Sequence, residues 1–371
     1  MRRDGKENGL EAKIYEKPWR LKTNKIQYLI KGGELLKRFF GYEDEGNLCS
    51  QVWIASTVTS SVNGNEGLSQ VELDGDCRYL KDMIEEQPVQ ILGENHVERF
   101  GSSAGVLIKM LNSCDRLLVQ AHPDQEKAKR YFHSDYGKTE SWYVLDLDEN
   151  VESPCIYAGF KPGVDRESFR RLIEIQDTEK ILDCLYRFEI QKGQVILIPA
   201  GLPHTLGAGS LMIEIQEPVD ITLRAERIRP DGSELPEESL HSGIGLEALL
   251  DCFDFTIRSE EETRKRIFIS PRILREDGKI SEEVLIGPDT TTCFGMNRIR
   301  MNGMGETRTY EKENGAFTIV LVTDGCGRIV TDAGEEALLK GTEIWIPNGV
   351  KTYRYETENS LEIVECYPPQ I

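Results

Sequence analysis

The sequence predicts a mainly β protein that contains two double-sheet barrels of the jelly-roll type, with a few helices inserted in and between them. Many short runs of Val, Ile, Leu and aromatic residues are separated by Gly and Pro turns, as in such barrels. One strand–turn–strand pattern occurs twice, 148 residues apart. The chain has 371 residues, which is longer than one average domain, so we expect two.

The repeated pattern runs from Gly193 to His204 and again from Gly341 to Thr352. In both copies a run of apolar residues leads into Pro and Gly, which indicates a buried strand that enters a turn. Another apolar strand follows each turn, so each copy is predicted to be a hairpin. The last position of the pattern is His204 in the first copy and Thr352 in the second. If this position carries a metal ligand, only the first barrel binds metal.

The remaining elements follow from local patterns. We expect strands over 140–147, 155–160 and 186–190 in the first barrel, and over 316–322 and 327–331 in the second. Helices are predicted over 123–132, with Asp124 near the start, and over 168–175, with Asp165 as the candidate N-cap. The polar stretch 229–239 indicates a connection, and a short amphipathic segment follows at 244–253. These features predict a metal-binding barrel domain over 1–230, a linker and helical segment over 231–290, and a metal-free barrel over 291–371.

Composition limits the partners and the compartment. The net charge of −19 argues against binding to nucleic acid or to an anionic membrane surface, although a small anionic ligand is compatible with it. No apolar run is long enough to span a bilayer, and the polar N-terminus contains no signal peptide. Nine cysteines without a C-x-x-C pair indicate reduced thiols. We therefore expect a cytoplasmic monomer or homodimer with a small-molecule partner.

Four residues form a candidate metal site. Gln120 and His122 lie on the same face of a predicted strand, Glu140 stands at the entrance of another strand, and His204 ends the first repeat. Two imidazoles, one carboxylate and one amide oxygen can hold Zn²⁺ and leave a position open. A single buried His is more commonly a hydrogen-bonded core residue, but three ordered motifs on one barrel favour a metal. One carboxylate leaves the site with a net charge near +1.

The other three histidines lack such a context. We expect these residues to lie in loops or on helix surfaces: His96, His133 and His241.

At these motifs the sequence resembles type I phosphomannose isomerase, a zinc enzyme family of the cupin superfamily. The resemblance is carried by 106–111, 120–124, 137–143, 198–207 and 220–224, and the second barrel is typical of its shorter bacterial members. It implies that one zinc ion per chain is bound by Gln120, His122, Glu140 and His204. It also implies that three basic residues line the active site: Lys109, Lys138 and Arg224.

The resemblance implies an aldose–ketose isomerase that interconverts mannose 6-phosphate and fructose 6-phosphate through an enediol. A Lewis-acidic zinc suits this chemistry because charge develops on the oxygens next to the reacting carbon. Lys138 and Arg224 are the expected catalytic residues, and Lys109, Lys138 and Arg224 are expected to bind the substrate. The group that removes the proton stays open.

The sequence departs from the family at Leu118, where a Ser is usual, and at Gln51, where a Glu is common. Two alternatives therefore stay open. One is a different metal-dependent cupin enzyme, such as an iron oxygenase that uses His122, Glu140 and His204. The other is a sugar-phosphate-binding regulator without catalysis.

Overall fold

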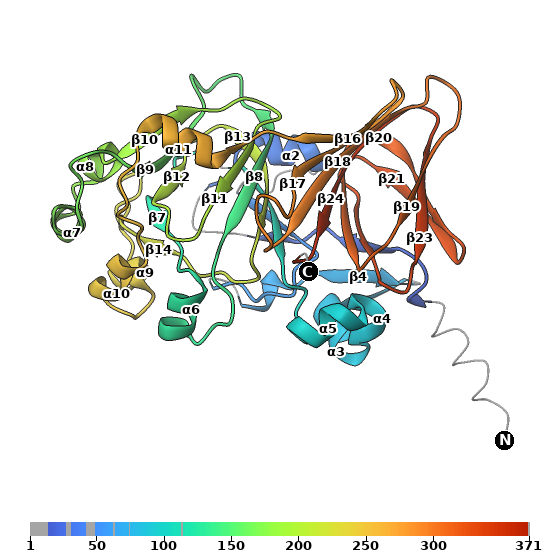
Figure 1. Ribbon diagram of the computed structural model, residues 1–371, viewed down its shortest axis with the longest axis horizontal. Helices are drawn as coiled ribbons and strands as arrows, with labels where there is room; N and C mark the ends of the chain where they lie inside the picture. Colours follow the sequence, from blue (N-terminus) through green and yellow to red (C-terminus); the bar gives the residue numbers. More distant parts are fainter. Residues whose placement is uncertain are drawn as a thin grey trace. The chain divides into compact units, whose positions relative to one another are not determined.

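The structure, a computed structural model, describes residues 14–26, 31–41, 49–61, 64–73, 75–112 and 114–369. The polar N-terminus discussed above lies outside these residues. The chain forms two compact units, each assembled from separate stretches (Figure 1). Unit 1 comprises Met1–Lys25, Val52–Ile108 and Pro271–Ile371, and unit 2 comprises Ile26–Gln51 and Lys109–Ser270.

Unit 2 contains the first copy of the repeat and most of two sheets that enclose an apolar core. Residues 25, 52–54 and 107–108 of the larger sheet belong to unit 1. The seven-stranded sheet consists of β2 (Lys25–Ile26), β3 (Gln51–Ile54), β6 (Leu107–Asn112), β8 (Glu140–Leu147), β11 (Val195–Ile198), β13 (Ser210–Gln216) and β15 (Phe268–Ile269), in the order β15-β11-β8-β13-β6-β3-β2. The five-stranded sheet consists of β7 (Gln120–Ala121), β9 (Cys155–Phe160), β10 (Leu185–Glu189), β12 (His204–Leu206) and β14 (Leu223–Arg224), in the order β10-β9-β12-β7-β14. Ile156 and Leu206 from the smaller sheet pack with Trp142 and Met212 from the larger one. Unit 2 therefore has the predicted double-sheet architecture.

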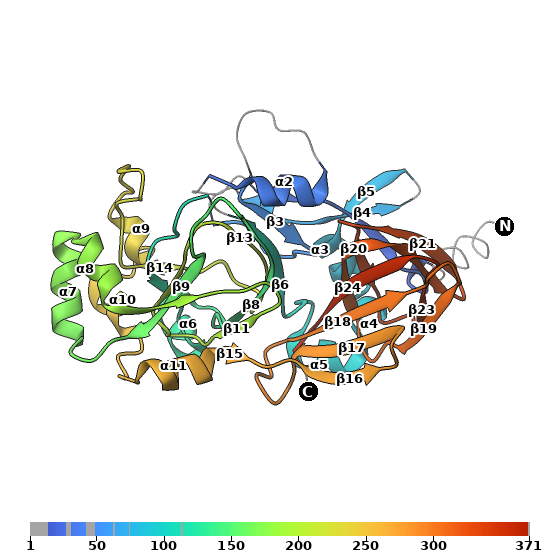
Figure 2. The same ribbon diagram turned by 90° about the horizontal axis from the view of Figure 1, so that it is seen from above.

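Helices lie around the sheets of unit 2. They are α2 (Glu34–Phe40), α6 (Gln125–Phe132), α7 (Arg166–Ile175), α8 (Thr178–Asp183), α9 (Glu238–His241), α10 (Leu246–Asp251) and α11 (Glu260–Ile267). The predicted N-cap of α7 is confirmed, and Asp124 is the N-cap of α6: Asp124 and Asp165 accept hydrogen bonds from the backbone N–H groups of Lys127 and Ser168. Helices α7 and α8 lie beside β9 and β10 (Figures 1 and 2), where Phe169 belongs with Phe160 of β9 to a second apolar cluster.

Unit 1 contains the second copy of the repeat. Its strands are β1 (Trp19–Lys22), β4 (Gln70–Leu73), β5 (Asp76–Tyr79), β16 (Arg272–Glu276), β17 (Ile280–Ile286), β18 (Gly295–Asn302), β19 (Arg308–Glu313), β20 (Thr318–Thr331), β21 (Gly334–Leu339), β22 (Glu343–Ile346), β23 (Thr352–Thr357) and β24 (Ser360–Tyr367). The main path of its sheet is β16-β17-β18-β24-β20-β22-β1-β4-β5, while β19, β21 and β23 pair off this path. Val320, Ile344 and Ile363 pack with Tyr355 in the core. The helices are α3 (Leu80–Glu86), α4 (Pro88–Leu92) and α5 (Glu94–Phe100).

The units differ from the contiguous domains that the sequence predicts. Strand β1 pairs with β22, with Trp19 opposite Trp345, so an N-terminal strand extends the sheet that holds the C-terminus. Between residues 231 and 290, helices α9–α11 are followed by β15, β16 and β17 rather than by helix alone. The predicted strands over 316–322 and 327–331 form one continuous strand, β20, with a bulge after Val322. Local patterns do not reveal which sheet edge a distant strand joins, and this explains the differences.

The repeat occupies corresponding strand–turn–strand segments, β11 and β12 in unit 2 and β22 and β23 in unit 1. The predicted hairpins are wrong: β11 and β12 belong to different sheets, and β22 pairs with β1 and β20 whereas β23 pairs with β19 and β20. Leu202 and Val350, 148 residues apart, both belong to a core. The next inward-facing residue is His204 in unit 2 but Tyr353 in unit 1, while Thr352 is exposed. The predicted equivalence of His204 and Thr352 is therefore wrong by one residue, because the second turn is one residue longer.

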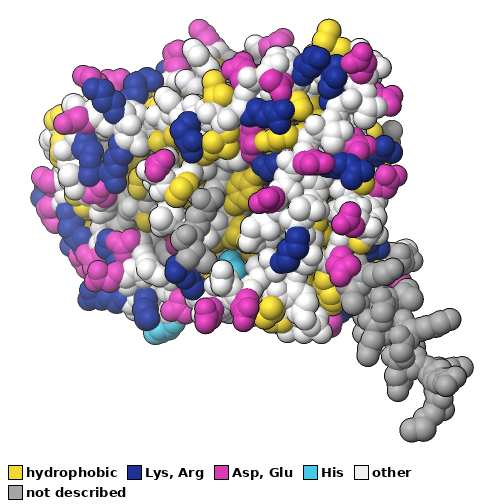
Figure 3. Space-filling model, turned by 45° about the vertical axis from the view of Figure 1, so that its right-hand side comes forward, with side chains coloured by type: hydrophobic (Ala, Val, Ile, Leu, Met, Phe, Trp, Pro, Cys, Tyr) yellow, Lys and Arg dark blue, Asp and Glu magenta, His cyan; other side chains and the backbone are white. Residues whose placement is uncertain are grey.

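Two further sequence expectations concern the surface. His133 is exposed at the end of α6, but His96 is buried on α5, where its ring contacts Phe100 and Phe317, so the surface position predicted for His96 is wrong. In Figure 3 the coloured Lys and Arg side chains are interspersed with Asp and Glu. Among the described residues, no helix is both long and apolar enough to cross a membrane.

Candidate metal centre and substrate cavity

Strand pairing in unit 2 brings the candidate metal ligands together. Gln120 of β7 lies opposite His204 of β12, and Glu140, the first residue of β8, lies opposite Ile198 of β11. His122 follows β7 directly, so it points to the same side as Gln120. One ligand atom from each of His122, Glu140 and His204 lies within 4.8 Å of the other two, and all three residues are buried.

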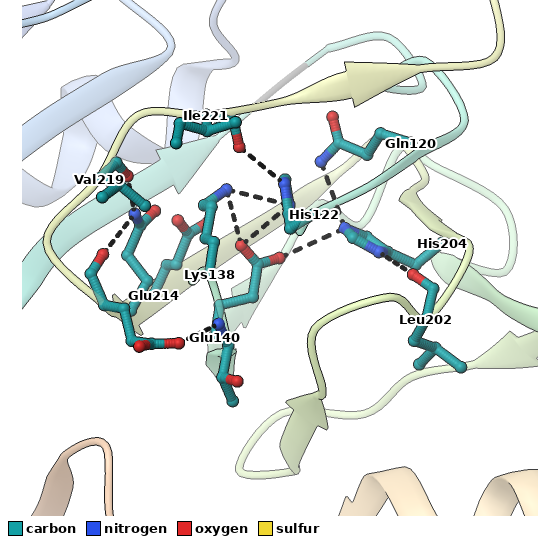
Figure 4. A network of polar contacts seen from close by, with 12 residues as sticks. Gln120, His122, Lys138, Glu140, Leu202, His204, Glu214, Val219 and Ile221 are labelled. Atoms are coloured by element: carbon teal, nitrogen blue, oxygen red, sulfur yellow. Dashed lines mark hydrogen bonds and ion pairs between the residues drawn. The ribbon is translucent and has the colours of Figure 1, made fainter. Parts of the chain in front are cut away.

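The distances within this cluster are short. Glu140 Oε2 lies 3.3 Å from His122 Nε2, and Glu140 Oε1 lies 3.4 Å from His204 Nε2. The Gln120 amide lies 3.3 Å from the same His204 nitrogen. A half-turn of the amide presents its oxygen, which is a suitable metal ligand, at this point. Figure 4 shows the four side chains converging on one place.

Backbone carbonyls fix the orientation of both imidazoles. His122 Nδ1 lies 3.0 Å from the Ile221 carbonyl oxygen, and His204 Nδ1 lies 2.8 Å from that of Leu202 (Figure 4). A carbonyl only accepts, so each Nδ1 carries the proton and donates it. The lone pair of each Nε2 then faces the cluster, as in His–metal sites with an oriented outer shell.

Electrostatics keep these ligands in the forms that bind metal. Burial lowers the pKa of His122 to about 3, and the nearby Lys138 ammonium acts in the same direction, so this imidazole is neutral at physiological pH. Burial alone would raise the pKa of Glu140, but Lys138 and His122 hold it well below its usual range. Glu140 Oε2 is buried without a hydrogen-bond partner of normal geometry, although the Lys138 ammonium lies 2.9 Å away. A neutral imidazole and an ionised carboxylate whose Oε2 lacks a hydrogen bond of normal geometry fit a divalent cation.

A cavity of about 290 Å³ opens beside the cluster. All three predicted basic residues line it, together with Gln120: Lys109, Lys138 and Arg224. Arg224 of β14 lies opposite Gln120 of β7 in the sheet, and its Nη1 donates to the Ser239 carbonyl oxygen at 3.1 Å. Leu118 and Gln51, the two departures from the family pattern, also line the cavity.

Acidic residues that the sequence analysis missed share this cavity. Lys109 Nζ lies 3.4 Å from Glu214 Oε1 and 3.8 Å from Asp220 Oδ1, and all three side chains are buried. Burial raises the pKa of Glu214, and the Glu140 carboxylate adds to this effect while Lys109 opposes it. In the sequence, Glu214 could have been noticed as a charged residue between apolar neighbours of β13.

Two arginines at the cavity wall were also missed. Arg116 forms a bidentate ion pair with buried Glu226, with N–O distances of 2.7 and 2.8 Å. Arg229 donates from Nη1 to Ser233 Oγ at 2.9 Å, but its Nε is buried without a partner. Their roles depend on neighbours far away in the sequence, so no local pattern reveals them.

Comparisons with known proteins agree with this architecture. The family description "phosphomannose isomerase type I, catalytic domain" matches residues 44–148. A mannose-6-phosphate isomerase of Streptococcus mutans is 25% identical over 362 residues, which cover 96% of this chain and 97% of the relative. The crystal structure of mannose 6-phosphate isomerase from Bacillus subtilis is similar with a TM-score of 0.72 and 22% identity, covering 94% of this chain and 99% of that one. A zinc-bound mannose 6-phosphate isomerase structure gives a TM-score of 0.72 at 14% identity, over 95% of this chain and 100% of that one.

Fold and site define a mainly β protein with a buried metal-binding cluster beside a cation-lined cavity. The family recognised from the motifs around His122, Glu140 and His204 is confirmed: the chain is a relative of type I phosphomannose isomerase.

Proposed function

We propose that the chain is a zinc-dependent isomerase that interconverts mannose 6-phosphate and fructose 6-phosphate through an enediol. The observation that carries the proposal is the buried cluster of His122, Glu140 and His204, whose ligand atoms face one another beside the cavity. With Gln120 they form the set that would hold one zinc ion. When bound, zinc would act as a Lewis acid toward the oxygens on C1 and C2 of the sugar.

Lys138 connects this cluster to the cavity. Its ammonium lies 3.0 Å from His122 Nε2 and 2.9 Å from Glu140 Oε2. The single lone pair of His122 Nε2 would serve either a metal ion or this ammonium, and Lys138 also lines the cavity. There the ammonium stabilises negative charge that develops on a substrate oxygen.

Glu214 is our candidate for the group that carries the proton between C1 and C2. It is buried, it lines the cavity, and it contacts Lys109. Proton transfer is most effective when the pKa of the carrier lies near the working pH, and burial raises the pKa of Glu214 in this direction. Arg224 stays protonated and therefore stabilises charge rather than acting as a base.

One arginine of the cavity wall, which has no carboxylate ion pair among the described residues, supports a phosphate-bearing substrate. Lys109, Arg116 and Lys138 each have a carboxylate within 4 Å, at the distances given above. Arg229, by contrast, has a buried Nε donor without a partner and a neutral Ser233 contact. A buried donor of this kind requires an acceptor, and a phosphate oxygen matches the guanidinium geometry. We therefore assign the phosphate end of the cavity to Arg229.

The proposal includes a compartment. The nine cysteines are thiols in the structure rather than disulfides, which supports a reducing, cytoplasmic environment.

The test is incubation of zinc-replete protein with mannose 6-phosphate in deuterated water, followed by NMR. We expect fructose 6-phosphate to form and deuterium to appear at the reacting carbon. The proposal would be refuted if protein of verified zinc content gave no fructose 6-phosphate and no deuterium exchange. Binding without exchange would instead favour a non-catalytic regulator, an alternative that Leu118 at the cavity wall keeps open.

A further inference from the structure

The two units repeat one another strand by strand around their centres. Glu140 at the start of β8 lies opposite Ile198 of β11, and Thr318 at the start of β20 lies opposite Ile346 of β22. Ile346 is 148 residues after Ile198, the period of the sequence repeat. Thr318 in unit 1 therefore corresponds to Glu140 in unit 2.

The same comparison identifies the counterparts of the other candidate ligands. Gln120 lies opposite His204 in unit 2, and Lys312 of β19 lies opposite Tyr353 of β23 in unit 1. His122 comes two residues after Gln120, and Asn314 comes two residues after Lys312. The four positions Gln120, His122, Glu140 and His204 thus correspond to Lys312, Asn314, Thr318 and Tyr353.

Contacts within unit 1 agree with this correspondence. Thr318 Oγ1 donates to Asn314 Oδ1 at 3.1 Å, as their counterparts Glu140 and His122 approach within 3.3 Å. The correspondence also extends to the acidic neighbour of the site. Glu214 pairs opposite Trp142, two residues after Glu140, and Glu365 pairs opposite Val320, two residues after Thr318. Glu365 is therefore the counterpart of Glu214.

Lys312 of β19 carries a positive charge on a side chain that is 13% exposed. Its Nζ lies 3.0 Å from Glu365 Oε2 and 2.5 Å from Glu282 Oε1. Glu365 is fully buried, and it also accepts hydrogen bonds from Tyr353 Oη at 2.7 Å and Tyr355 Oη at 2.8 Å. Burial lowers the pKa of Lys312, but the attraction of Glu365 and Glu282 outweighs this effect and raises it. Lys312 is thus a partly buried ammonium ion with two carboxylate partners that are themselves buried.

We infer that unit 1 is a converted copy of the metal barrel, in which the ammonium group of Lys312 stands in the place of the metal ion. The inference rests on the proposed zinc site of unit 2, because that site identifies the corresponding place in unit 1. The contacts of Lys312 with Glu365 and Glu282 do not depend on the proposed function. A divalent cation and an ammonium ion both gather carboxylates, so the exchange keeps the interior organised without an external ligand. Bulky rings fill the rest of the interior. Tyr310 and Tyr355 stand at the positions of Leu118 and Leu206, which line the cavity of unit 2.

The first test removes the ammonium. Lys312→Met leaves Glu365 and Glu282 buried together without their cation. Breaking a buried ion pair from one side should lower the midpoint of thermal unfolding by roughly 6–20 °C. The double variant Lys312→Met/Glu365→Gln removes one charge of each sign and should recover more than half of that loss. Lys340→Met is the matched control, since the ammonium of Lys340 is about half exposed and lies 3.9 Å from Asp324. It should shift the midpoint by less than about 2 °C.

The second test asks whether the place accepts a metal. In Lys312→His an imidazole joins Glu365 and Glu282, a ligand set that suits zinc. We expect this variant to bind one more zinc ion per chain than the wild type, measured by elemental analysis, and to unfold at a higher temperature with zinc than without it.

Clear outcomes would overturn the inference. One is an unchanged unfolding midpoint for Lys312→Met, and another is a double variant that is no more stable than the single one. If Lys312→Met does not fold, the double variant decides the matter, since an unfolded double variant also contradicts the inference. A Lys312→His variant that takes up no additional zinc would show that the ammonium does not occupy a cation site. Isomerase activity is measured separately, so failure of the proposed function is distinguishable from failure here.

Discussion

Glu343 should make the stability of the protein depend on pH in a way that one substitution removes. This residue of β22 is 1% exposed, and neither carboxylate oxygen has a hydrogen-bond partner of normal geometry. Burial raises the pKa of Glu343 from 4.5 to about 8, against a small opposing effect of the Thr23 hydroxyl. In the native protein the side chain therefore keeps its proton at pH values at which the unfolded chain has lost it.

The sign and size of the effect follow from this difference. Below pH 4.5 both states are protonated, so Glu343 contributes no pH dependence. Between pH 4.5 and about 8 the native state binds the additional proton, so the free energy of unfolding falls as pH rises. At about 1.36 kcal/mol for each pH unit, the loss is about 3 kcal/mol at pH 7 and about 4 kcal/mol at pH 8, where the native side chain itself begins to ionise. Glu343→Gln has no proton to lose and should not show this decline.

Urea unfolding of the wild type and Glu343→Gln at pH 5 and pH 8 measures this prediction, with tryptophan fluorescence as the probe. The comparison uses the change with pH, because a buried amide also has a pH-independent cost. Glu311→Gln, on the exposed side of β19, is the control and should follow the wild-type profile. Parallel pH profiles for the wild type and Glu343→Gln would refute the reasoning.

Three further predictions concern the metal centre and the cavity. EDTA should abolish turnover while circular dichroism shows a folded protein, and stoichiometric zinc should restore activity; full activity of metal-free protein would contradict the metal site. His204→Ala should lose zinc in elemental analysis, whereas Thr352→Ala, an exposed residue, should keep it; equal losses would contradict the assignment of ligands. Arg224→Ala should lower kcat and kcat/KM together by about 10²- to 10³-fold at equal zinc content, whereas Arg229→Ala should mainly raise KM. If Arg224→Ala mainly raised KM and Arg229→Ala mainly lowered kcat in steady-state kinetics, Arg224 would be the phosphate-binding residue and Arg229 the catalytic one.

Much of the fold was predictable because its cause is local. The alternation of apolar residues and the Gly and Pro turns indicated the strands of both barrels, and Asp124 and Asp165 marked the starts of α6 and α7. The pairing of β1 with β22 was not predictable, because it depends on a contact between residues more than 300 positions apart. The one-residue shift between His204 and Tyr353 was hidden for a related reason. A match of sequence patterns does not show which residue of a turn faces inward.

The same distinction applies to the site. The motifs around Gln120, His122, Glu140 and His204 indicated residues that the structure brings together, because each motif fixes its own strand or turn. Glu214, Arg116 and Arg229 were missed, because burial and partners from other segments decide what a charged side chain does. Their assignment therefore required the structure.

The segment between His122 and Glu140 distinguishes the two barrels. It contains 17 residues, including α6 and Lys138, whereas only three residues separate the counterparts Asn314 and Thr318. The strands on either side keep the same register in both units, so the length of this connection is independent of the barrel. The longer connection is the one that carries Lys138 beside the candidate metal ligands. Changes of length or sequence in this connection can therefore alter the surroundings of the site while the strands keep their register.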